Sequence, residues 1–514
     1  MKTSLTLAIL LPLAGALLNM LLGRKLPRRL SEGIACGALF GSFLAAFAAF
    51  AAYRVPEMLP VAPWLTAFHF DAGFTLYADP LSLSLTLMIT FVCALIHLYS
   101  VGYMRGDAGY VRYFALLNLF VFAMLVLVLA GNLPLLYLGW EGVGFCSYSL
   151  IGFWYREKKN ADAGRKAFIV TRVGDVALLA ALICIFDLLG TLSIPQINSM
   201  GFLLPPGIVT TLGFLLLAGA TGKSAQLPLT VWLPDAMAGP TPVSAQIHAA
   251  TMVTAGVYLL ARMLPLIGGS EQVMSAICLV GGVTAFYGAT SALAQRDIKR
   301  VLAYSTISQI GFMMLGVGAG SPETATFHLL AHAFFKALLF LGAGCVIHAL
   351  HHEQDILRMG GLRKHAPFTY VAFAAGVACL AGLPPTGGFF SKDAVLAAAW
   401  GRGGTAAAMA ALSMLTAFLT SVYSFRLLYL VFHGDGPEGS RPPKLMEYVL
   451  GPLAVLGMCA GALDLPEYLG GGLLSAFLGH HGAHLSTGGE LALQLCAAAL
   501  AFAGWGTAHW LYGG

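Results

Sequence analysis

Charged side chains are scarce in this sequence. Only 10% of its 514 residues are Asp, Glu, Lys or Arg, whereas 58% are hydrophobic. Soluble domains usually carry about 25% charged residues, so this chain has too few charges to cover a water-facing surface of its size. Most of the surface must therefore face the hydrocarbon of a bilayer. The net charge of +5 does not indicate a nucleic-acid partner, because no long basic run is interleaved with aromatic residues.

Paired cysteines and nucleotide-binding fingerprints are also missing. The nine cysteines stand singly in apolar runs, without a CxxC pair or a Cys/His cluster at metal-ligand spacing. No GxGxxG fingerprint follows a predicted strand. The sequence therefore predicts no metal site and no redox cofactor on this chain. We interpret the cysteines as small apolar residues at helix interfaces.

Apolar stretches of about 20 residues, each long enough to cross a hydrocarbon core of ~30 Å, recur along the whole chain. They predict an all-α polytopic membrane protein with fifteen transmembrane spans. The segment 54–79 alternates apolar and polar residues and predicts a short hairpin. The expected spans are 3–22, 31–52, 80–102, 112–130, 132–154, 165–190, 207–233, 244–266, 272–294, 300–318, 323–349, 367–394, 404–432, 446–463 and 488–511.

Basic residues predict the orientation of these spans. They gather after the odd-numbered spans, for example Arg24, Lys25, Arg28 and Arg29 after the first. The positive-inside rule places such loops in the cytoplasm, which puts the N-terminus and the 54–79 hairpin outside. Because this basic cluster follows the first apolar run, that run is not expected to be a cleaved signal peptide.

Two spans are interrupted by prolines. The seventh contains Pro228 and Pro234, the twelfth contains Pro384 and Pro385, and each has a lysine beside the break. Spans four to eight and nine to thirteen form two groups of five, and an odd number of spans makes two repeats inverted. Inverted repeats with broken helices indicate an ion or substrate pathway. The expected parts are 1–111 (three spans and the hairpin), 112–268 and 269–432 (the two repeats), and 433–514 (the last two spans).

Charged residues inside the expected spans would each cost at least ~2.5–3.5 kcal/mol at the bilayer centre. They must therefore face an interior polar path, and fixed ion pairs that only hold helices together are the alternative. Three lysines distributed over both halves, two of them at helix breaks, favour ion transport. The residues are Glu141, Arg172, Asp175, Lys223, Lys336 and Lys392, with Asp393 next to the last.

Lysine is informative because, unlike arginine, it can release its proton when it is buried. A carboxylate about 6 Å away opposes that release by ~2.8 kcal/mol at an effective dielectric of ~20. A Glu/Lys couple is therefore a proton switch that needs no redox centre. Glu141 and Lys223 are the expected couple.

Histidines extend the predicted path. His328, His332 and Lys336 stand at i, i+4 and i+8, which places them on one stripe of a helix. The stripe predicts a proton relay, with hydrogen-bonded core histidines as the alternative. His248 is expected to connect Lys223 to the centre of the path.

Several long strings resemble the antiporter-type subunit L family of bacterial complex I, the NADH-quinone oxidoreductase, whose mitochondrial counterpart is subunit 5. The WEGVG and TRVGD strings and the lysine of GFFSKDAVL are more similar to subunit L than to its sister subunits. The resemblance covers about residues 80–430, and includes GKSAQLPLTVWLPDAMAGPTPVSAQIHAATMVTAGVYLLAR and HLLAHAFFKALLFLGAGCVIHALHHEQDILRMGGLRK.

The resemblance implies a role for each matching position. The family has a glutamate, an acidic residue that modulates it, a partner lysine, a histidine, a central lysine and a terminal lysine. In this sequence they correspond, in that order, to Glu141, Asp175, Lys223, His248, Lys336 and Lys392.

The expected function is proton movement from the cytoplasm to the periplasm, across the bacterial inner membrane, within NADH:quinone oxidoreductase. Redox chemistry in partner subunits, which would carry FMN and iron–sulfur clusters and bind NADH and quinone, would supply the energy. The expected partners include the sister antiporter-like subunits. Glu141 and Lys223 are expected to take up the proton at the cytoplasmic side. The residues expected to pass it through the centre are His248, His328, His332 and Lys336. Lys392 and Asp393 are expected to release it, and Lys299, just before the tenth span, is the last residue of the predicted site.

One departure from the family pattern leaves alternatives open. Subunit L usually continues into a long lateral helix, which is expected to be absent here because the sequence ends at Gly514. The alternative functions are a Mrp-type cation/proton antiporter and the membrane subunit of an inorganic-carbon transporter. A purely structural membrane spacer is a third class.

Overall fold

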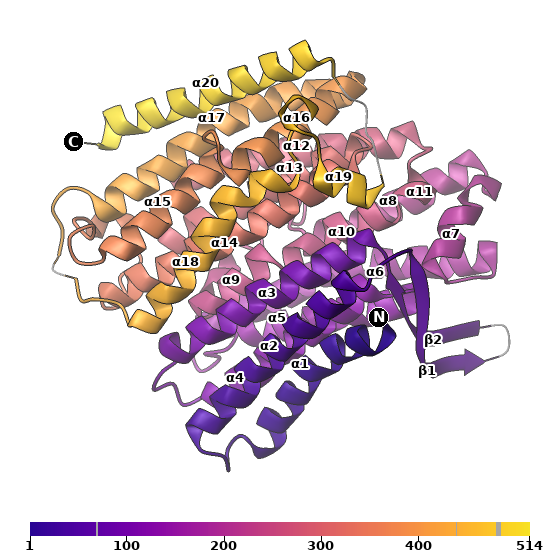
Figure 1. Cartoon of the computed structure of the whole chain (residues 1–514), viewed down its shortest axis with the longest axis horizontal. Helices are drawn as coiled ribbons and strands as arrows, with labels where there is room; N and C mark the ends of the chain where they lie inside the picture. The colour runs from indigo at the N-terminus through magenta and orange to yellow at the C-terminus, as the bar shows by residue number, and fades with distance from the viewer. Residues whose placement is uncertain (68–69, 438, 480–484, 514) are drawn as a thin grey trace. The chain divides into compact units, whose positions relative to one another are not determined.

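The computed structural model describes residues 1–67, 70–437, 439–479 and 485–513. Within these residues the chain forms two compact units, residues 1–224 with 238–273 and residues 225–237 with 274–514. Apart from one β-hairpin, the regular structure described is helical (Figure 1). The expected all-α membrane fold is confirmed.

The first unit is a bundle in which α1 packs against α2 and α4, α2 against α3, and α6 against α8. Its helices are α1 (Lys2–Leu22), α2 (Arg28–Ala51), α3 (Pro80–Tyr103), α4 (Tyr110–Leu129), α5 (Leu133–Ile151), α6 (Lys158–Leu189), α7 (Ile194–Met200), α8 (Pro206–Lys223), α9 (Thr241–Ala249), α10 (Ala255–Arg262) and α11 (Leu264–Ile267).

The second unit is built around α14, which packs against α13, α15, α16 and α18. In the most apolar window of α14, 94% of the residues are buried, whereas in α20 only 33% are. A predominantly apolar helix that is buried on nearly every side lies in the core. The helices are α12 (Glu271–Ala294), α13 (Ile298–Gly318), α14 (Pro322–Ala349), α15 (Pro367–Ala381), α16 (Gly387–Arg402), α17 (Gly404–Phe432), α18 (Lys444–Cys459), α19 (Leu473–Leu478) and α20 (Thr487–Tyr512).

Twelve helical stretches among the described residues are long and apolar enough to cross a membrane, one of them formed by α9 and α10 together (Thr241–Arg262), and each coincides with one of the fifteen expected spans. The fifth and seventh expected spans correspond to α5 and α8, shorter helices of 19 and 18 residues. The twelfth is divided between α15 and α16 at the predicted break.

The break expected in the seventh span (207–233) is present, and no α-helix resumes before residue 233. The helix α8 ends at Lys223, and no α-helix follows until α9. Pro228 has no N–H to donate to the carbonyl four residues earlier, so the helix cannot continue through it. A 3-10 turn, η2 (Asp235–Ala238), is the regular structure in this stretch.

The eighth span contains a break that the sequence analysis missed. Residues 250–254 separate α9 from α10, with the 3-10 turn η3 (Met252–Thr254) between them. No proline lies in this stretch. Instead, the hydroxyls of Thr251 and Thr254 donate to backbone carbonyls at 2.7 Å and 2.6 Å. Threonine hydroxyls compete in this way with the backbone donors of a helix.

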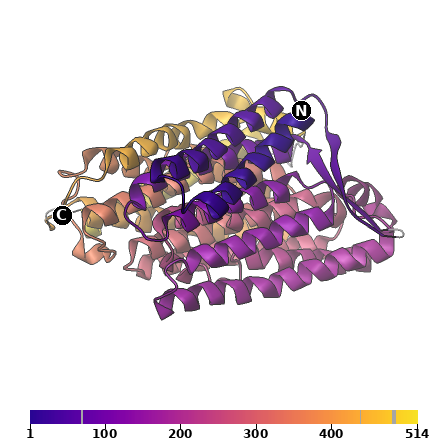
Figure 2. The same ribbon diagram turned by 90° about the horizontal axis from the view of Figure 1, so that it is seen from below.

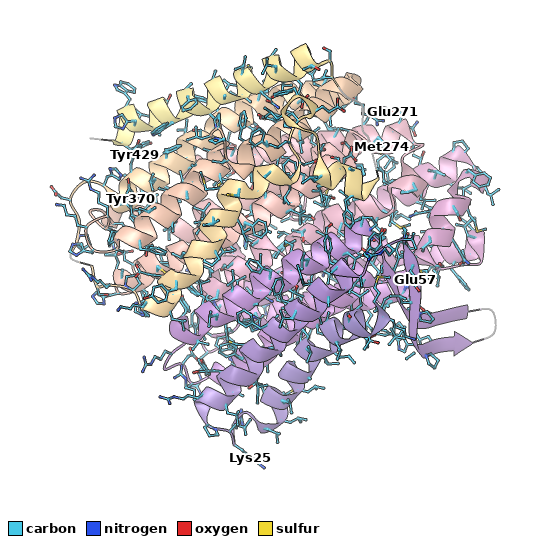
Figure 3. All side chains as sticks on the ribbon, in the orientation of Figure 1. Lys25, Glu57, Glu271, Met274, Tyr370 and Tyr429 are labelled. Carbon is cyan, nitrogen blue, oxygen red and sulfur yellow. The ribbon has the colours of Figure 1, made fainter. Side chains whose placement is uncertain are left out.

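The hairpin expected between residues 54 and 79 is confirmed. Strands β1 (Glu57–Ala67) and β2 (Phe70–Ala78) pair antiparallel, with register shifts around Ala62, close to Pro60 and Pro63. Proline cannot donate to a ladder and is typical of such irregular positions. In the first unit the hairpin lies at the opposite end of the α1–α2 pair from Lys25, as the labels of Glu57 and Lys25 show (Figure 3). Figure 2 shows the same hairpin from below.

A buried ion pair closes the end of α3 next to the hairpin. Asp79 caps α3 by accepting from the N–H of Ser82 at 2.9 Å, and both its oxygens accept from Arg262 of α10, at 2.5 Å and 2.8 Å. Burial alone raises the pKa of Asp79, but the Arg262 guanidinium outweighs burial and holds that pKa below its ordinary value of 3.8. The pair is therefore ionised at neutral pH.

We predict that Asp79→Asn lowers the free energy of unfolding by about 3–5 kcal/mol, because Arg262 is left buried without a counter-charge. The pKa of Asp79 is lower in the folded than in the unfolded state. The stabilisation is therefore complete above about pH 5 and disappears as the pH falls through the lowered pKa. Thermal unfolding of the purified protein between pH 3 and 7 measures both effects.

The control for this prediction is Asp187→Asn, which changes an exposed carboxylate on α6. Its unfolding curve should match that of the parent at every pH. Equal stability of the Asp79→Asn protein and the parent at pH 7 would contradict the role given to the pair.

Candidate functional site

A buried lysine–carboxylate pair joins α8 to α6. Lys223 is the last residue of α8, and its ammonium donates to Oδ2 of Asp175 at 3.1 Å. Trp140 of α5 donates its Nε1–H to the other carboxylate oxygen at 2.6 Å. Both charged side chains are 1% exposed, so each has lost its hydration and depends on the other for compensation.

Glycines make this close approach possible. A Cβ on Gly174 would lie 3.1 Å from the Cα of Gly222, so α6 and α8 meet backbone to backbone beside the pair. A Cβ on Gly144 of α5 would lie 2.7 Å from the Nζ of Lys223. The ammonium therefore occupies space that a side chain at position 144 would fill.

Glu141 is paired with an arginine. Arg172 of α6 donates to its Oε1 at 2.5 Å, and the Nε of Arg172 lies 3.9 Å from Oδ2 of Asp175. Charges therefore alternate along Lys223, Asp175, Arg172 and Glu141. The sequence paired Lys223 with Glu141, whereas the structure places Asp175 against Lys223, and two further charges separate the expected partners.

His248 is fully buried near the end of α9, just before the break at residues 250–254. The hydroxyl of Ser224, which follows Lys223, donates to the Val253 carbonyl inside that break at 2.7 Å. The end of α8 is thus hydrogen-bonded to the break beside His248. This places His248 and Lys223 on directly connected elements of the first unit.

The predicted stripe lies on a single helix, α14, and His328, His332 and Lys336 are all fully buried. The two imidazole centroids are 6.3 Å apart. The Nδ1 of His328 lies 3.0 Å from the hydroxyl of Ser391, and its Nε2 lies 3.2 Å from Oε1 of Gln309. The predicted helix and its shared face are confirmed by this placement.

Lys336 is held by neutral groups and has no carboxylate partner in the described part of the chain. Its ammonium donates to the Ser305 hydroxyl at 2.7 Å and to the Leu302 carbonyl at 3.2 Å. Tyr423 donates to the same serine hydroxyl at 2.8 Å. The charge that acts on Lys336 is the like charge of Lys392. Lys336 and Lys223 therefore lie in opposite electrostatic surroundings.

The break between α15 and α16 provides a partner for Lys392. In a continuous helix the carbonyl of Leu380 would accept from the N–H of residue 384, which is a proline and has none. The ammonium of Lys392 donates to this carbonyl at 2.9 Å and lies 5.5 Å from the centroid of the Phe312 ring. Asp393 is 3% exposed, and its Oδ2 has no hydrogen-bond partner among the described residues.

Lys299 contacts the chain that follows the seventh-span break. It is the second residue of α13, and its ammonium donates to the Met237 carbonyl at 2.5 Å. Its neighbour Arg300 binds Asp235 at 3.2 Å. Both cations therefore hold the η2 turn within the second unit.

A cavity of about 200 Å³ lies beside α16 in the second unit, lined by Phe390 and Ala394 of that helix. Its lining is acidic, and among the described residues no three His, Cys, Asp or Glu side chains are grouped to hold a metal ion. One of these acids, Glu490, acts electrostatically on Asp393. The acidic residues that line the cavity are Glu323, Asp464, Glu467 and Glu490.

The neutral partners of the buried charges were not predicted from the sequence. They are Trp140, which binds Asp175, and Ser305 and Tyr423, which surround Lys336. A usable signal existed for Ser305, because a hydroxyl side chain in an otherwise buried apolar helix needs a partner. Tryptophan in an apolar helix carries no such signal, since it is typical of any membrane protein.

Comparison with known proteins assigns the family. Residues 130–420 match the family described as "NADH:quinone oxidoreductase/Mrp antiporter, TM", and residues 64–114 match "NADH-Ubiquinone oxidoreductase (complex I), chain 5 N-terminus". NADH-quinone oxidoreductase subunit L of Escherichia coli (strain K12) is 46% identical over 99% of this chain and 83% of its own length. The chain belongs to the subunit L family. The Pseudomonas aeruginosa subunit L is 47% identical, over 97% of this chain and 82% of its own length.

Solved structures share the fold of this subunit L family member. A chain of the Mrp complex from Dietzia sp. DQ12-45-1b superposes with a TM-score of 0.84 at 29% identity, and covers 99% of this chain. This chain spans 56% of the length of that Mrp chain. A chain of the archaeal membrane-bound sulfane sulfur reductase, 24% identical with a TM-score of 0.79, shares the fold. As a member of the subunit L family, this chain is a multi-pass protein of the bacterial inner membrane.

We predict that alanine at the two site glycines has different effects on folding. Gly174→Ala should lower the free energy of unfolding by about 1–3 kcal/mol, because the new Cβ meets the backbone of α8. Gly144→Ala should cost less than Gly174→Ala, because its Cβ meets only the flexible end of Lys223, which can shift while staying near Asp175. Thermal unfolding of the purified variants measures this difference.

The control is Gly37→Ala in α2, where a Cβ meets nothing within 4 Å. It should be neutral or stabilising by up to about 1 kcal/mol, because alanine is the better helix former. Equal destabilisation by Gly144→Ala and Gly174→Ala would contradict this prediction. It would show that the Lys223 side chain cannot move away from a Cβ at position 144.

Proposed function

We propose that this chain moves protons from the cytoplasm to the periplasm as a membrane subunit of an NADH:quinone oxidoreductase. The observation that carries the proposal is the presence of three buried lysines, Lys223, Lys336 and Lys392, each held by different groups. Against a membrane potential of ~150 mV each proton costs ~3.5 kcal/mol. Partner subunits with FMN, iron–sulfur clusters, NADH and quinone would supply that energy, and this chain would carry no redox step.

The input switch would be the row Lys223, Asp175, Arg172 and Glu141. At 3.1 Å the Asp175–Lys223 attraction is about 5 kcal/mol at an effective dielectric of ~20, and it falls inversely with distance. Movement of the carboxylate toward Arg172, whose Nε is 3.9 Å away, would weaken the attraction that keeps Lys223 protonated. In this scheme Asp175 is the moving group, and Glu141 fixes Arg172.

Central transfer would use His248 in the first unit and the α14 stripe in the second. The surroundings of His328 fit two protonation states. The Ser391 hydroxyl donates to the Gly387 carbonyl at 2.7 Å, so it accepts from Nδ1–H of His328. A charged imidazolium then donates its second N–H to the Oε1 of Gln309, whereas a neutral ring needs the Gln309 amide to turn and donate to Nε2.

The rotating amide would let His328 take up and release a proton without moving its ring. The Nε2 of Gln309 has no hydrogen-bond partner among the described residues, so turning the amide breaks no second bond. His332 and Lys336, four and eight residues further along α14, would be the next carriers. Lys299 would support the relay by holding the η2 turn.

The exit would consist of Lys392, Asp393 and the acidic cavity beside α16. Asp393 is next to Lys392 and within the electrostatic reach of Glu490, a residue of the cavity wall. The positive-inside orientation places this wall at the periplasmic side. In the proposed arrangement, residues 112–268 and 269–432 are the two inverted repeats, and their broken spans carry the entry and exit lysines.

The second candidate function is cation/proton antiport, which the Mrp superposition at a TM-score of 0.84 favours. Purification of the chain from native membranes separates these functions by its partners. Co-purification of flavin and iron–sulfur subunits would support the oxidoreductase function. Co-purification of further antiporter subunits without them would support cation/proton antiport instead. A single large soluble zinc protein would indicate the inorganic-carbon transporter.

We predict that Lys223→Arg assembles normally but lowers NADH-driven proton pumping to less than about a tenth, because arginine keeps the charge and cannot release its proton. Lys223→Ala should also stop pumping while leaving Asp175 buried without its partner. Acidification of inverted membrane vesicles, compared with NADH oxidation in the same vesicles, measures the effect. Normal pumping by the Lys223→Arg complex would remove Lys223 from the mechanism.

We predict that Lys392→Glu folds yet pumps substantially less than the parent. The protonated form of glutamate is neutral where protonated lysine is +1, so the repulsion with Lys336 is lost. A glutamate also cannot donate to the Leu380 carbonyl unless it is protonated. Proton pumping of the reconstituted complex, with Lys444→Glu on the cytoplasmic side as control, tests this. Equal pumping by the Lys392→Glu complex and the parent would show that charge at this position is immaterial.

A further inference from the structure

A second cavity, unrelated to the buried lysines, lies in the first unit where α1, α4, α5 and α6 have their cytoplasmic ends. Its volume is about 690 Å³, far more than a few water molecules need. Its apolar wall includes Met20, Leu21 and Leu116. Met20 and Leu21 are 56% and 72% exposed, so this wall continues into the surface that faces the acyl chains.

Two arginines line the same cavity, and none of the described residues that line it is acidic. Arg112 is held in place, because its Nη2 donates to the Phe153 carbonyl at 2.7 Å. Its guanidinium carbon lies 4.5 Å and 4.9 Å from the ring centroids of Phe153 and Tyr155. Arg24 is exposed and forms no ion pair with a described residue. The cavity therefore presents two guanidinium groups whose charges are not neutralised.

The position of the cavity fits the cytoplasmic headgroup layer. Arg24 follows α1 and Arg112 lies in the first turn of α4, and the positive-inside rule places both of these helix ends at the cytoplasmic side. Tyr148 and Tyr155 also line the cavity, and tyrosine is typical of the level at which headgroups meet acyl chains. A basic pocket between helices on this side matches an anionic lipid in both charge and polarity.

We infer that this cavity binds one anionic phospholipid. Its phosphate accepts from the guanidinium groups of Arg24 and Arg112, and an acyl chain lies along Met20, Leu21 and Leu116. Arginine suits this role because its planar fork donates two hydrogen bonds to one phosphate. Phosphatidylethanolamine, which has no net charge, brings an ammonium group that the two arginines repel.

The test uses the assembled complex in native membrane vesicles and a photoactivatable phosphatidylglycerol. Peptides covering residues 111–116 and 148–155 should be labelled, and the matching phosphatidylethanolamine probe should label them at least fivefold less. The double variant Arg24→Gln, Arg112→Gln should lose at least four fifths of the phosphatidylglycerol labelling. A second double variant, Arg112→Lys with Arg24→Gln, is a milder change, because it keeps one positive charge near Phe153.

Arg29→Gln is the matched control, because Arg29 belongs to the same basic cluster, in the first turn of α2, and is exposed but does not line the cavity. Its labelling should equal that of the parent. Equal labelling by the two lipid probes, or labelling that is unchanged in both arginine pairs, would overturn the inference. Absence of lipid labelling together with crosslinks from these peptides to another subunit would show that a protein covers the cavity, and would overturn it as well.

Discussion

Inside a bilayer no water is available to replace a missing backbone hydrogen bond, and this constraint governs the structure. A helix can be interrupted there only where its freed groups find partners within the protein. At the twelfth span the carbonyl of Leu380 loses its donor to Pro384 and takes the ammonium of Lys392. At the eighth span, threonine hydroxyls bond to the carbonyls around the break. Each interruption therefore also positions a polar group.

The three buried lysines illustrate three ways to keep an amine inside a membrane. Lys223 has a carboxylate at 3.1 Å, Lys336 has a hydroxyl and a carbonyl, and Lys392 has one carbonyl and an aromatic face. These environments differ in how strongly they favour the charged form, since only the first contains a countercharge in direct contact. A set of titratable groups with graded proton affinity is what a stepwise carrier of protons requires.

The sequence was sufficient for features that depend on one segment at a time. Hydrophobic length predicted the spans, alternation predicted the hairpin, and the i, i+4, i+8 spacing placed His328, His332 and Lys336 on one face of α14. Proline chemistry predicted the break before α16. The break at residues 250–254 was not predicted, because it contains no proline or glycine and only its threonines distinguish it.

Features that depend on two segments at once were beyond the sequence. The spacing of Glu141, Asp175 and Lys223 gives no indication of which acid faces the lysine, because that choice follows from how closely α6 and α8 approach at Gly174 and Gly222. The members of the first unit's charged row were therefore all noted in the sequence, but the expected pairing of Lys223 with Glu141 differs from the observed pairing with Asp175. The neutral partner Trp140 was missed for the same reason.

The Glu141–Arg172 pair has a consequence for biogenesis. Its side chains are 23% and 38% exposed on helices of the membrane bundle, and charged groups in contact with hydrocarbon are costly. A newly inserted chain on its own would therefore have to draw water or headgroups toward this pair. Covering the pair with a protein surface removes that cost, so the free chain should be the less stable form in the membrane. Such a difference gives proteolytic quality control a physical basis for distinguishing orphan copies from assembled ones.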